Sequence, residues 1–290
     1  MSYEDTALGG TSGLSGLSAF HDDALVRVVK RVGRKRKKYA VVCPHAGKTF
    51  CFTKFQQTLR QLPLDECHVL LYDNSRCDKH RSRLVGLAGT LPSYTLVEDL
   101  NQPESIESTA NVHRIVERCS AVYQNIYENY LPAKSDYVVN LEDDVLAPKG
   151  GFARLQNVMN VYPTVGTVVG NCRDRRVVVT TGEHEPIAVN FLKTSRLGGT
   201  SAGPSYAVQA VVEQEFGVEA IGAAHMGLWL SRRECVDAVG MRTEPTREGM
   251  PLGHDIQYGL RLNEAGWKFA VDWSVKLEHF YQRDGITLSI

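Results

Sequence analysis

The sequence predicts an α/β protein in which a mostly parallel central sheet is covered by helices on both faces, as a three-layer sandwich. Through residues 39–170, apolar runs of strand length alternate with segments of helical periodicity. We expect strands at 39–44, 68–72, 94–97, 137–141 and 165–170, and helices at 50–62, 104–130 and 152–159. Repeated alternation favours a parallel sheet, because each crossover between parallel strands needs a helix-length connection.

Each of these elements has a local reason. The first strand is rich in β-branched valine and ends at Pro44. The helix after it carries apolar residues at helical spacing and stops at Pro63. The long helix at 104–130 has a broad apolar stripe and ends before Pro132. The strand at 137–141 begins with an aromatic and β-branched run, which is the composition of a buried strand.

The pattern changes after this first half. A stretch rich in Gly, Ser and Thr at 195–204 is too long for a tight turn, so we expect either a functional lid or a surface insertion. Small apolar residues at 221–230 predict another buried strand. A helix is expected from 251 to 265, with Gly266 as its stop, and extended pieces follow within 267–280.

Charge is unevenly distributed along a chain whose formal net charge is zero. Residues 1–38 carry eight Lys and Arg against four Asp and Glu, and all eight cations lie between Arg27 and Lys38. We expect a flexible leader at 1–19 and a short helix at 20–32. The basic segment from Arg27 to Lys38 predicts either a solvated flank or a site for a polyanion, such as nucleic acid or an anionic membrane.

Composition indicates an ordinary globular protein of 290 residues, of which 43% are hydrophobic and 23% charged. The seven cysteines are scattered without a C-x-x-C pair, which favours reduced thiols over disulfides or a zinc site. There is no apolar run of transmembrane length and no secretory signal pattern. We therefore expect a cytoplasmic protein, in the host cytoplasm if the source is viral.

Acidic side chains end two of the expected strands. Glu142, Asp143 and Asp144 follow the strand at 137–141, where three adjacent carboxylates repel one another unless a divalent cation lies between them. Mg²⁺ and Mn²⁺ prefer such oxygen ligands, although a solvated acidic turn is the alternative. Asp73 ends the strand at 68–72, where it forms either a turn or a contact to a nucleotide base or ribose.

In their order and spacing, four motifs resemble GT-A nucleotide-sugar glycosyltransferases, most closely family 2. The resemblance covers roughly residues 39–280. The motifs are V-V-C-P ending at Pro44, L-L-Y-D-N-S-R-C-D at 70–78, L-E-D-D-V at 141–145 and G-H-D-I-Q-Y-G-L-R-L-N-E-A-G-W at 253–267. The last motif is the longest and most specific, but His254 stands where many relatives have Glu. The family's arginine-rich nucleotide loop is not clear in this sequence.

The resemblance implies a role for each matching residue. A Mn²⁺ or Mg²⁺ ion would be held by Asp144 and His279, and Asp255 would be the general base in a single displacement with inversion. Donor-binding residues would be Pro44, Asp73, Arg114, Glu142 and Asp143. Asp73 would contact a base, most often uracil, and Glu142 or Asp143 the ribose or donor sugar.

The implied protein is a hexosyltransferase that uses a nucleotide-sugar donor, most often a UDP-sugar. Its flexible leader and basic segment would occupy 1–38, and its GT-A domain 39–290, with a nucleotide-binding half at 39–170 and an acceptor-binding half at 171–290. The acceptor stays open among hydroxymethylated DNA bases, a glycan and a lipid, and the basic segment makes DNA of interest. Alternatives are a metal-dependent nucleotidyltransferase and a non-catalytic nucleotide- or sugar-binding module of the same fold.

Overall fold

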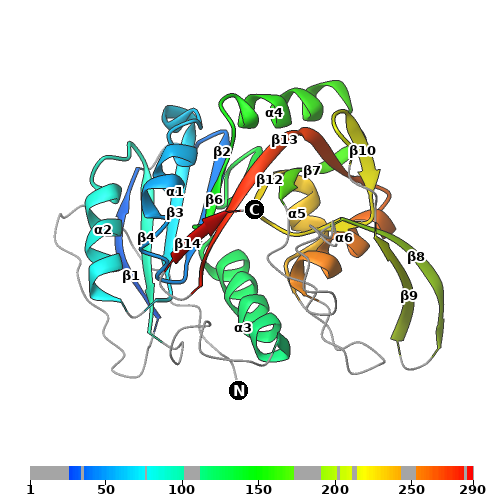
Figure 1. Cartoon of the computed structure of the whole chain (residues 1–290), viewed down its shortest axis with the longest axis horizontal. Coiled ribbons are helices and arrows are strands. Elements are labelled where there is room, and N and C mark those ends of the chain that lie inside the picture. Colours follow the sequence, from blue (N-terminus) through cyan, green and yellow to red (C-terminus); the bar gives the residue numbers. More distant parts are fainter. Residues whose placement is uncertain are drawn as a thin grey trace, which may run out of the picture.

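The computed structural model describes residues 26–33, 36–75, 77–100, 112–172, 191–200, 203–210, 214–242, 253–283 and 286–289. Its main sheet has the strand order β1-β4-β3-β2-β5-β12-β7-β13-β10 (Figure 1). These strands are β1 Val26–Val32, β2 Tyr39–His45, β3 Cys67–Asp73, β4 Tyr94–Asp99, β5 Tyr137–Leu141, β7 Val165–Cys172, β10 Val218–Ile221, β12 Leu228–Arg232 and β13 Lys268–Arg283. Strands β4, β3, β2 and β5 pair in parallel, as do β7 and β13.

Strand β12 lies between β5 and β7 and runs antiparallel to both, so the sheet is mixed but mostly parallel. Short β6 (Val145–Leu146) and β14 (Ile286–Ser289) pair with the far part of β13. Strand β13 therefore begins beside β7 in the sheet and continues to the residues that follow β5. This path brings the end of the chain to the carboxylate strand.

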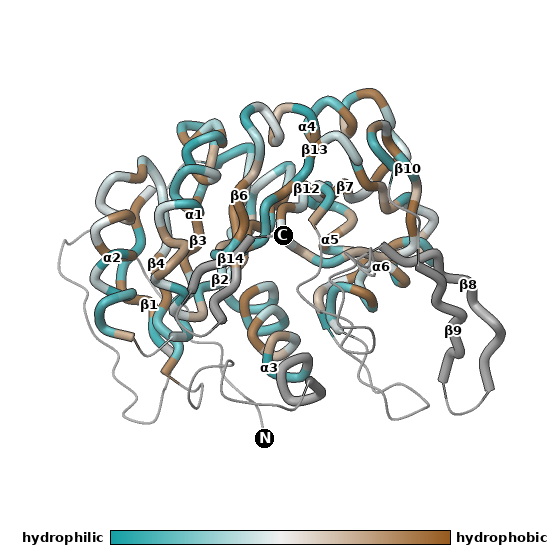
Figure 2. The backbone as a smooth tube through the Cα atoms, viewed as in Figure 1, coloured by the Kyte–Doolittle hydropathy of each residue, from teal (hydrophilic) through white to brown (hydrophobic). Residues whose placement is uncertain are grey.

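Helices cover both faces of the sheet, which confirms the three-layer prediction. Side chains of α1 (Phe52–Leu59), α2 (Asp78–Ala88) and α4 (Gly151–Val161) pack into one apolar cluster. Those of α3 (Val112–Asn125), the following π-helix η3 (Ile126–Tyr130), α5 (Arg233–Val239) and α6 (His254–Glu264) pack into the other. Figure 2 shows apolar residues along the central strands and mixed polar and apolar residues on the helices. No helix in the described ranges is long and apolar enough to span a membrane.

Strand alternation explains the two clusters. In β2, Val41 and Cys43 face the α1–α2–α4 layer, whereas Val42 between them faces the α3–α5–α6 layer. All three side chains are completely buried. A strand covered on both faces reads as a continuous apolar run, and this is the pattern that identified it in the sequence.

The helix expected at 20–32 is wrong over the described residues, because Val26–Val32 form the edge strand β1. This strand pairs antiparallel with β4, from Arg27 opposite Glu98 to Val32 opposite Tyr94. Valine-rich sequence suits a pleated strand better than a helix, and the open edge of β4 supplies its hydrogen-bond partners. The boundary proposed at residue 38 stays a prediction, although β1 already belongs to the sheet.

The glycine-rich stretch at 195–204 is not the long loop that we expected. Strands β8 (Phe191–Thr200) and β9 (Gly203–Ala210) form an antiparallel hairpin that also pairs, through β8, with the short strand β11 (Ala223–Ala224). The hairpin projects at the opposite end of the molecule from β1 (Figure 1). Cross-strand pairing gave these residues regular structure that their composition did not indicate. A role as a lid stays a prediction.

Close packing of α6 on the chain before β11 gives a stability prediction for Gly259→Ala. A Cβ atom at Gly259 would lie 2.5 Å from the carbonyl oxygen of Gly222 and 2.8 Å from the Cα of Ala223. Both contacts are with backbone, so we expect a loss of about 1–3 kcal/mol in unfolding free energy. Gly86→Ala is the control, because its Cβ meets nothing within 4 Å and alanine favours the helix by about 0.5–1 kcal/mol. If chemical denaturation showed that both substitutions change the unfolding free energy in the same direction, this explanation would be contradicted.

Candidate active site

The predicted carboxylates lie at the carboxyl end of β5, where parallel α/β sheets bind ligands. Asp143 and Asp144 are almost completely buried, and Glu142 is partly exposed. Strand β6 follows immediately and pairs with β13, so Val145 lies opposite His279. The backbone N–H of Phe280 donates to the carbonyl oxygen of Asp144 over 2.8 Å. This pairing fixes the position of His279 against the acidic turn.

Glu142, Asp144 and His279 form a cluster with the chemistry of a divalent-cation site. Each offers one ligand atom, and these atoms all lie within 4.8 Å of one another. His279 Nε2 is 3.3 Å from Asp144 Oδ2, and both side chains are buried. Two carboxylates and an imidazole fit Mn²⁺ or Mg²⁺, which take mainly oxygen ligands. The structure thus brings Asp144 and His279 together, and it adds Glu142, which the resemblance had assigned to the donor.

Lys48 belongs to this site although no sequence motif pointed to it. Its ammonium lies 2.7 Å from Asp144 Oδ2 and 3.2 Å from Asp143 Oδ1. No site residue was predicted in the loop after β2, which contains Lys48. The available signal in the sequence was a lysine shortly after β2, because β2 pairs with β5 and ends beside the acidic turn. The ammonium balances two neighbouring carboxylates that would otherwise repel each other.

Asp143 is held by the β2–α1 connection rather than turned toward the cation cluster. Its Oδ2 accepts a hydrogen bond from the backbone N–H of Ala46 over 3.0 Å. Burial raises the pKa of its carboxyl group, and the nearby Lys48 opposes that rise. Its proposed contact with ribose or donor sugar stays a prediction.

A buried histidine pair lies behind Asp143. His80 Nε2 is 3.3 Å from His45 Nδ1, which in turn is 3.8 Å from Asp143 Oδ2. Burial lowers the pKa of His45 well below its usual range, and His80 and Lys48 lower it further. Burial also lowers the pKa of His80. Both rings are therefore neutral at pH 7, and they pack edge-on against Phe55 and Phe52.

Asp73 ends β3 two strands away from the acidic turn, on the same edge of the sheet. Its Oδ1 accepts hydrogen bonds from the backbone N–H and the hydroxyl of Ser75, over 3.0 and 2.5 Å. Its buried Oδ2 has only the Arg81 guanidinium nearby, at 3.6 Å, and accepts no hydrogen bond among the described residues. Pro44 lies beside it on β2, opposite Tyr72. Asp73 is thus both an Asx turn and an available acceptor.

The Arg114 side chain lies outside the described residues, although its backbone belongs to α3. Its contact with the nucleotide stays a prediction. Later turns of the same helix do reach the site, because α3 packs against the first turn of α6.

Asp255 is partly exposed in the first turn of α6, and its Oδ1 accepts a hydrogen bond from the N–H of Ile256 over 2.9 Å. Its neighbour His254 is buried and stacks on Tyr123 of α3, with ring centroids 4.2 Å apart. Burial lowers the pKa of His254, while the negative charges of Asp255 and Glu142 oppose the shift. His254 thus anchors the start of α6 against α3.

His225 extends the acidic edge from another element. Its Nδ1 is 3.7 Å from Glu142 Oε2, and its ring centroid is 5.6 Å from that of His279. The residue follows β11 in a run of small apolar side chains, which the sequence analysis interpreted only as a buried strand. A histidine in such a run was the available signal.

No protein-family model and no curated protein sequence matches this chain. Similar solved structures do exist. GalNAc-T7 with UDP, GalNAc and Mn²⁺ is 11% identical with a TM-score of 0.51, over 87% of this chain and 45% of that one. The Pyrobaculum calidifontis mannosyltransferase PcManGT with GDP-Man and Mn²⁺ is 15% identical with a TM-score of 0.44. This match covers 87% of this chain and 56% of that one. S. aureus TarS residues 1–349 with UDP-GlcNAc is 10% identical with a TM-score of 0.46, and the match covers 86% of this chain and 60% of that one.

The chain spans about half the length of GalNAc-T7 and of PcManGT. At such low identity the likeness to GalNAc-T7 concerns the backbone architecture alone. It agrees with the α/β architecture and the mostly parallel central sheet described above. The chain has a GT-A-like glycosyltransferase fold.

Proposed function

We propose that this protein is a metal-dependent glycosyltransferase that moves a hexose from a UDP-sugar to an acceptor hydroxyl group. The observation that carries the proposal is the Glu142–Asp144–His279 cluster at the carboxyl edge of a GT-A-like sheet. A bound Mn²⁺ or Mg²⁺ ion would supply Lewis acidity to the diphosphate leaving group. Lys48 adds a further positive charge beside Asp144 and the neighbouring Asp143.

Donor binding follows from the neighbouring strand ends. Asp73 has a buried oxygen that can accept a hydrogen bond from a base such as uracil. Pro44 lies next to it and would contact the nucleotide, with Arg114 as a further phosphate or ribose contact. Glu142 or Asp143 would bind ribose or the donor sugar, and the partial exposure of Glu142 favours Glu142.

Transfer would occur by a single displacement at the anomeric carbon. Asp255 accepts the proton of the acceptor hydroxyl while that oxygen bonds to the sugar carbon. The bond from this carbon to the diphosphate oxygen breaks, and the electron pair leaves with the nucleotide. Attack from the face opposite the leaving group inverts the anomeric centre.

Two acceptor classes remain within this proposal: hydroxymethylated DNA bases and a glycan or lipid. The geometry divides the basic segment between the two edges of the sheet. Arg27 lies opposite Glu98 near the carboxyl edge, whereas Val32 lies opposite Tyr94 at the other edge. The described cations from Arg31 onward therefore lie toward the edge remote from the carboxylates, so DNA bound there must extend across the sheet to reach the site.

Thermal unfolding with UDP and Mn²⁺ tests the proposal. We expect the two ligands together to raise the melting temperature of the wild type by more than either does alone, since only the folded state binds them. Asp144→Asn should abolish this joint shift, because it removes a charged ligand from the cluster. Asp237→Asn, on the exposed side of α5, is the matched control and should keep it.

The result also separates the enzyme from a binding module. A joint shift without UDP release in the presence of any sugar donor and acceptor would support the non-catalytic alternative. A shift that survives in Asp144→Asn would reject the proposed cation site.

A further inference from the structure

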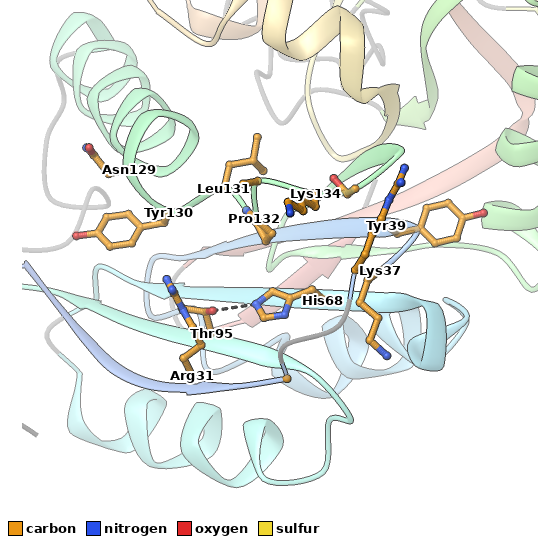
Figure 3. Close-up of a pocket in the computed structure, with 14 residues that line it drawn as sticks. Arg31, Lys37, Tyr39, His68, Thr95, Asn129, Tyr130, Leu131, Pro132 and Lys134 are labelled. Carbon is orange, nitrogen blue, oxygen red and sulfur yellow. Dashed lines mark hydrogen bonds between the residues drawn. The ribbon is translucent and has the colours of Figure 1, made fainter. Parts of the chain in front are cut away.

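A pocket of about 420 Å³ lies at the opposite edge of the sheet from the carboxylates. It is bounded by the link between β1 and β2, the first residues of β2 to β4, and the segment between η3 and β5 (Figure 3). Tyr39 begins β2 at this pocket, and His45 ends the strand beside Asp143. Seven residues at about 3.3 Å each separate the two sites by roughly 20 Å. The pocket is thus a separate site.

Positive charge converges on this pocket from distant parts of the chain. The cationic residues that line it are Arg31, Arg36, Lys37 and Lys134. None of the described residues that line it is an Asp or a Glu. Arg36 forms an ion pair with Asp136 just outside the lining, so only part of the charge is balanced locally. Arg31 approaches from β1 and Lys134 from the opposite wall (Figure 3).

The floor of the pocket is rigid and neutral. His68 makes contacts of 2.7 Å with the Ser93 hydroxyl and 2.8 Å with the Thr95 hydroxyl. Burial, together with the smaller effect of the positive charges of Arg31 and Lys37, lowers its pKa to about 4. The ring is therefore uncharged at pH 7. Arg31 lines the pocket beside it, whereas the Lys37 ammonium donates a hydrogen bond to the carbonyl oxygen of Asp65 over 2.6 Å.

The edge strand β1 divides its charge between the two faces of the sheet. Lys30 lies 6.0 Å from the centre of the Tyr94 ring on the α1–α2–α4 side, and Arg27 forms an ion pair with Glu98 over 2.6 Å. The charge of the pocket therefore comes from its own lining, with Arg31 and Lys134 on separate walls. A polymer with regularly spaced phosphates can contact both walls at once more readily than a ligand with a single phosphate can. The hollow shape also favours a strand that enters the pocket over a flat membrane surface.

We propose that the pocket between β1 and the η3–β5 segment binds the phosphodiester backbone of a nucleic acid strand. Asn129 and Ser135, which also line the pocket, supply hydrogen-bonding groups beside the cations. Phosphate contacts of this kind position a strand without reading its sequence. This inference is independent of sugar transfer, because the pocket shares no residue with the acidic edge.

Charge reversal at the two walls tests the inference. Arg31→Glu combined with Lys134→Glu should weaken binding of a labelled single-stranded oligodeoxynucleotide at least about tenfold, measured by fluorescence anisotropy. The slope of log affinity against log salt should become shallower by about 0.7 for each phosphate that the variant no longer neutralises. The control combines Lys268→Glu with Lys276→Glu, two exposed lysines of β13 that change the net charge equally. It should bind almost as the wild type does.

The outcomes are distinct. Equal weakening in both double variants would overturn the proposal, because it would show a general charge effect. Binding of the wild type to phosphatidylserine vesicles but not to the oligonucleotide would overturn it in favour of a membrane. Melting temperatures confirm that both variants fold. The melting-temperature shift with UDP and Mn²⁺ is measured separately. If that test contradicted the proposed enzyme activity, a positive oligonucleotide-binding result would still support this inference.

Discussion

Asp255→Asn should reduce turnover roughly 10³-fold while nucleotide binding stays close to that of the wild type. An amide cannot accept the proton of the acceptor hydroxyl, so the chemical step loses its base. The amide oxygen can still accept the hydrogen bond that Asp255 Oδ1 receives from the N–H of Ile256, so the start of α6 should persist. UDP release in the presence of donor and acceptor measures turnover, and the UDP and Mn²⁺ melting shift measures binding.

Glu264→Gln provides the control for this variant. It makes the same chemical change at the exposed last turn of the same helix, far from the acidic edge. We expect wild-type turnover from it. If Asp255→Asn also kept wild-type turnover, Asp255 would be a helix-start residue and another group would have to act as the base. If it lost the nucleotide shift as well, its role would be structural.

Lys48→Met should destabilise the metal-free protein by about 3 kcal/mol, because it leaves two buried carboxylates without their ammonium partner. Methionine keeps most of the side-chain volume, so the change tests charge rather than packing. Saturating Mn²⁺ should restore much of the loss, since a divalent cation can balance the same charges. Chemical denaturation with Mn²⁺ and with a chelator measures both effects.

Two further variants sharpen this result. Lys48→Arg keeps the positive charge and should retain most of the stability. Lys149→Met removes an exposed lysine and should change the unfolding free energy by less than about 0.5 kcal/mol. A Lys48→Met protein as stable as the wild type in chelator would show that the ammonium does not balance Asp143 and Asp144.

The sequence predicted those parts of the fold that are buried on both sides. Apolar runs identified β2, β3, β5 and β7, because a central strand has no solvent-facing side to interrupt the pattern. Edge elements were harder, since β1 and the β8–β9 hairpin depend on partners far away in the sequence. Local composition does not reveal which distant strand a segment will pair with. The valine-rich stretch of β1 was therefore predicted as a helix, and the glycine-rich stretch of the β8–β9 hairpin as a loop.

In the candidate site, too, some residues could be predicted from the sequence and others could not. Asp144 and His279 were expected to meet because the family resemblance linked them, and the pairing of β6 with β13 explains how they do. Lys48, His45 and His80 had no such motif. Their importance comes from the approach of the β2–α1 connection to Asp143, which only the folded structure reveals. The roles of Asp73 and Asp255 stay predictions that the variants above can test.

The insertion of β12 between β5 and β7 has a consequence for biosynthesis. A ribosome completes both neighbours by Cys172, but β12 is not made until residues 228–232 emerge. During that interval β5 has one unpaired edge, and β7 has two, because its other neighbour β13 is made later still. Such edges recruit other chains, so the nascent protein is most prone to aggregate at this stage. Slower growth at low temperature should therefore raise the yield of native protein.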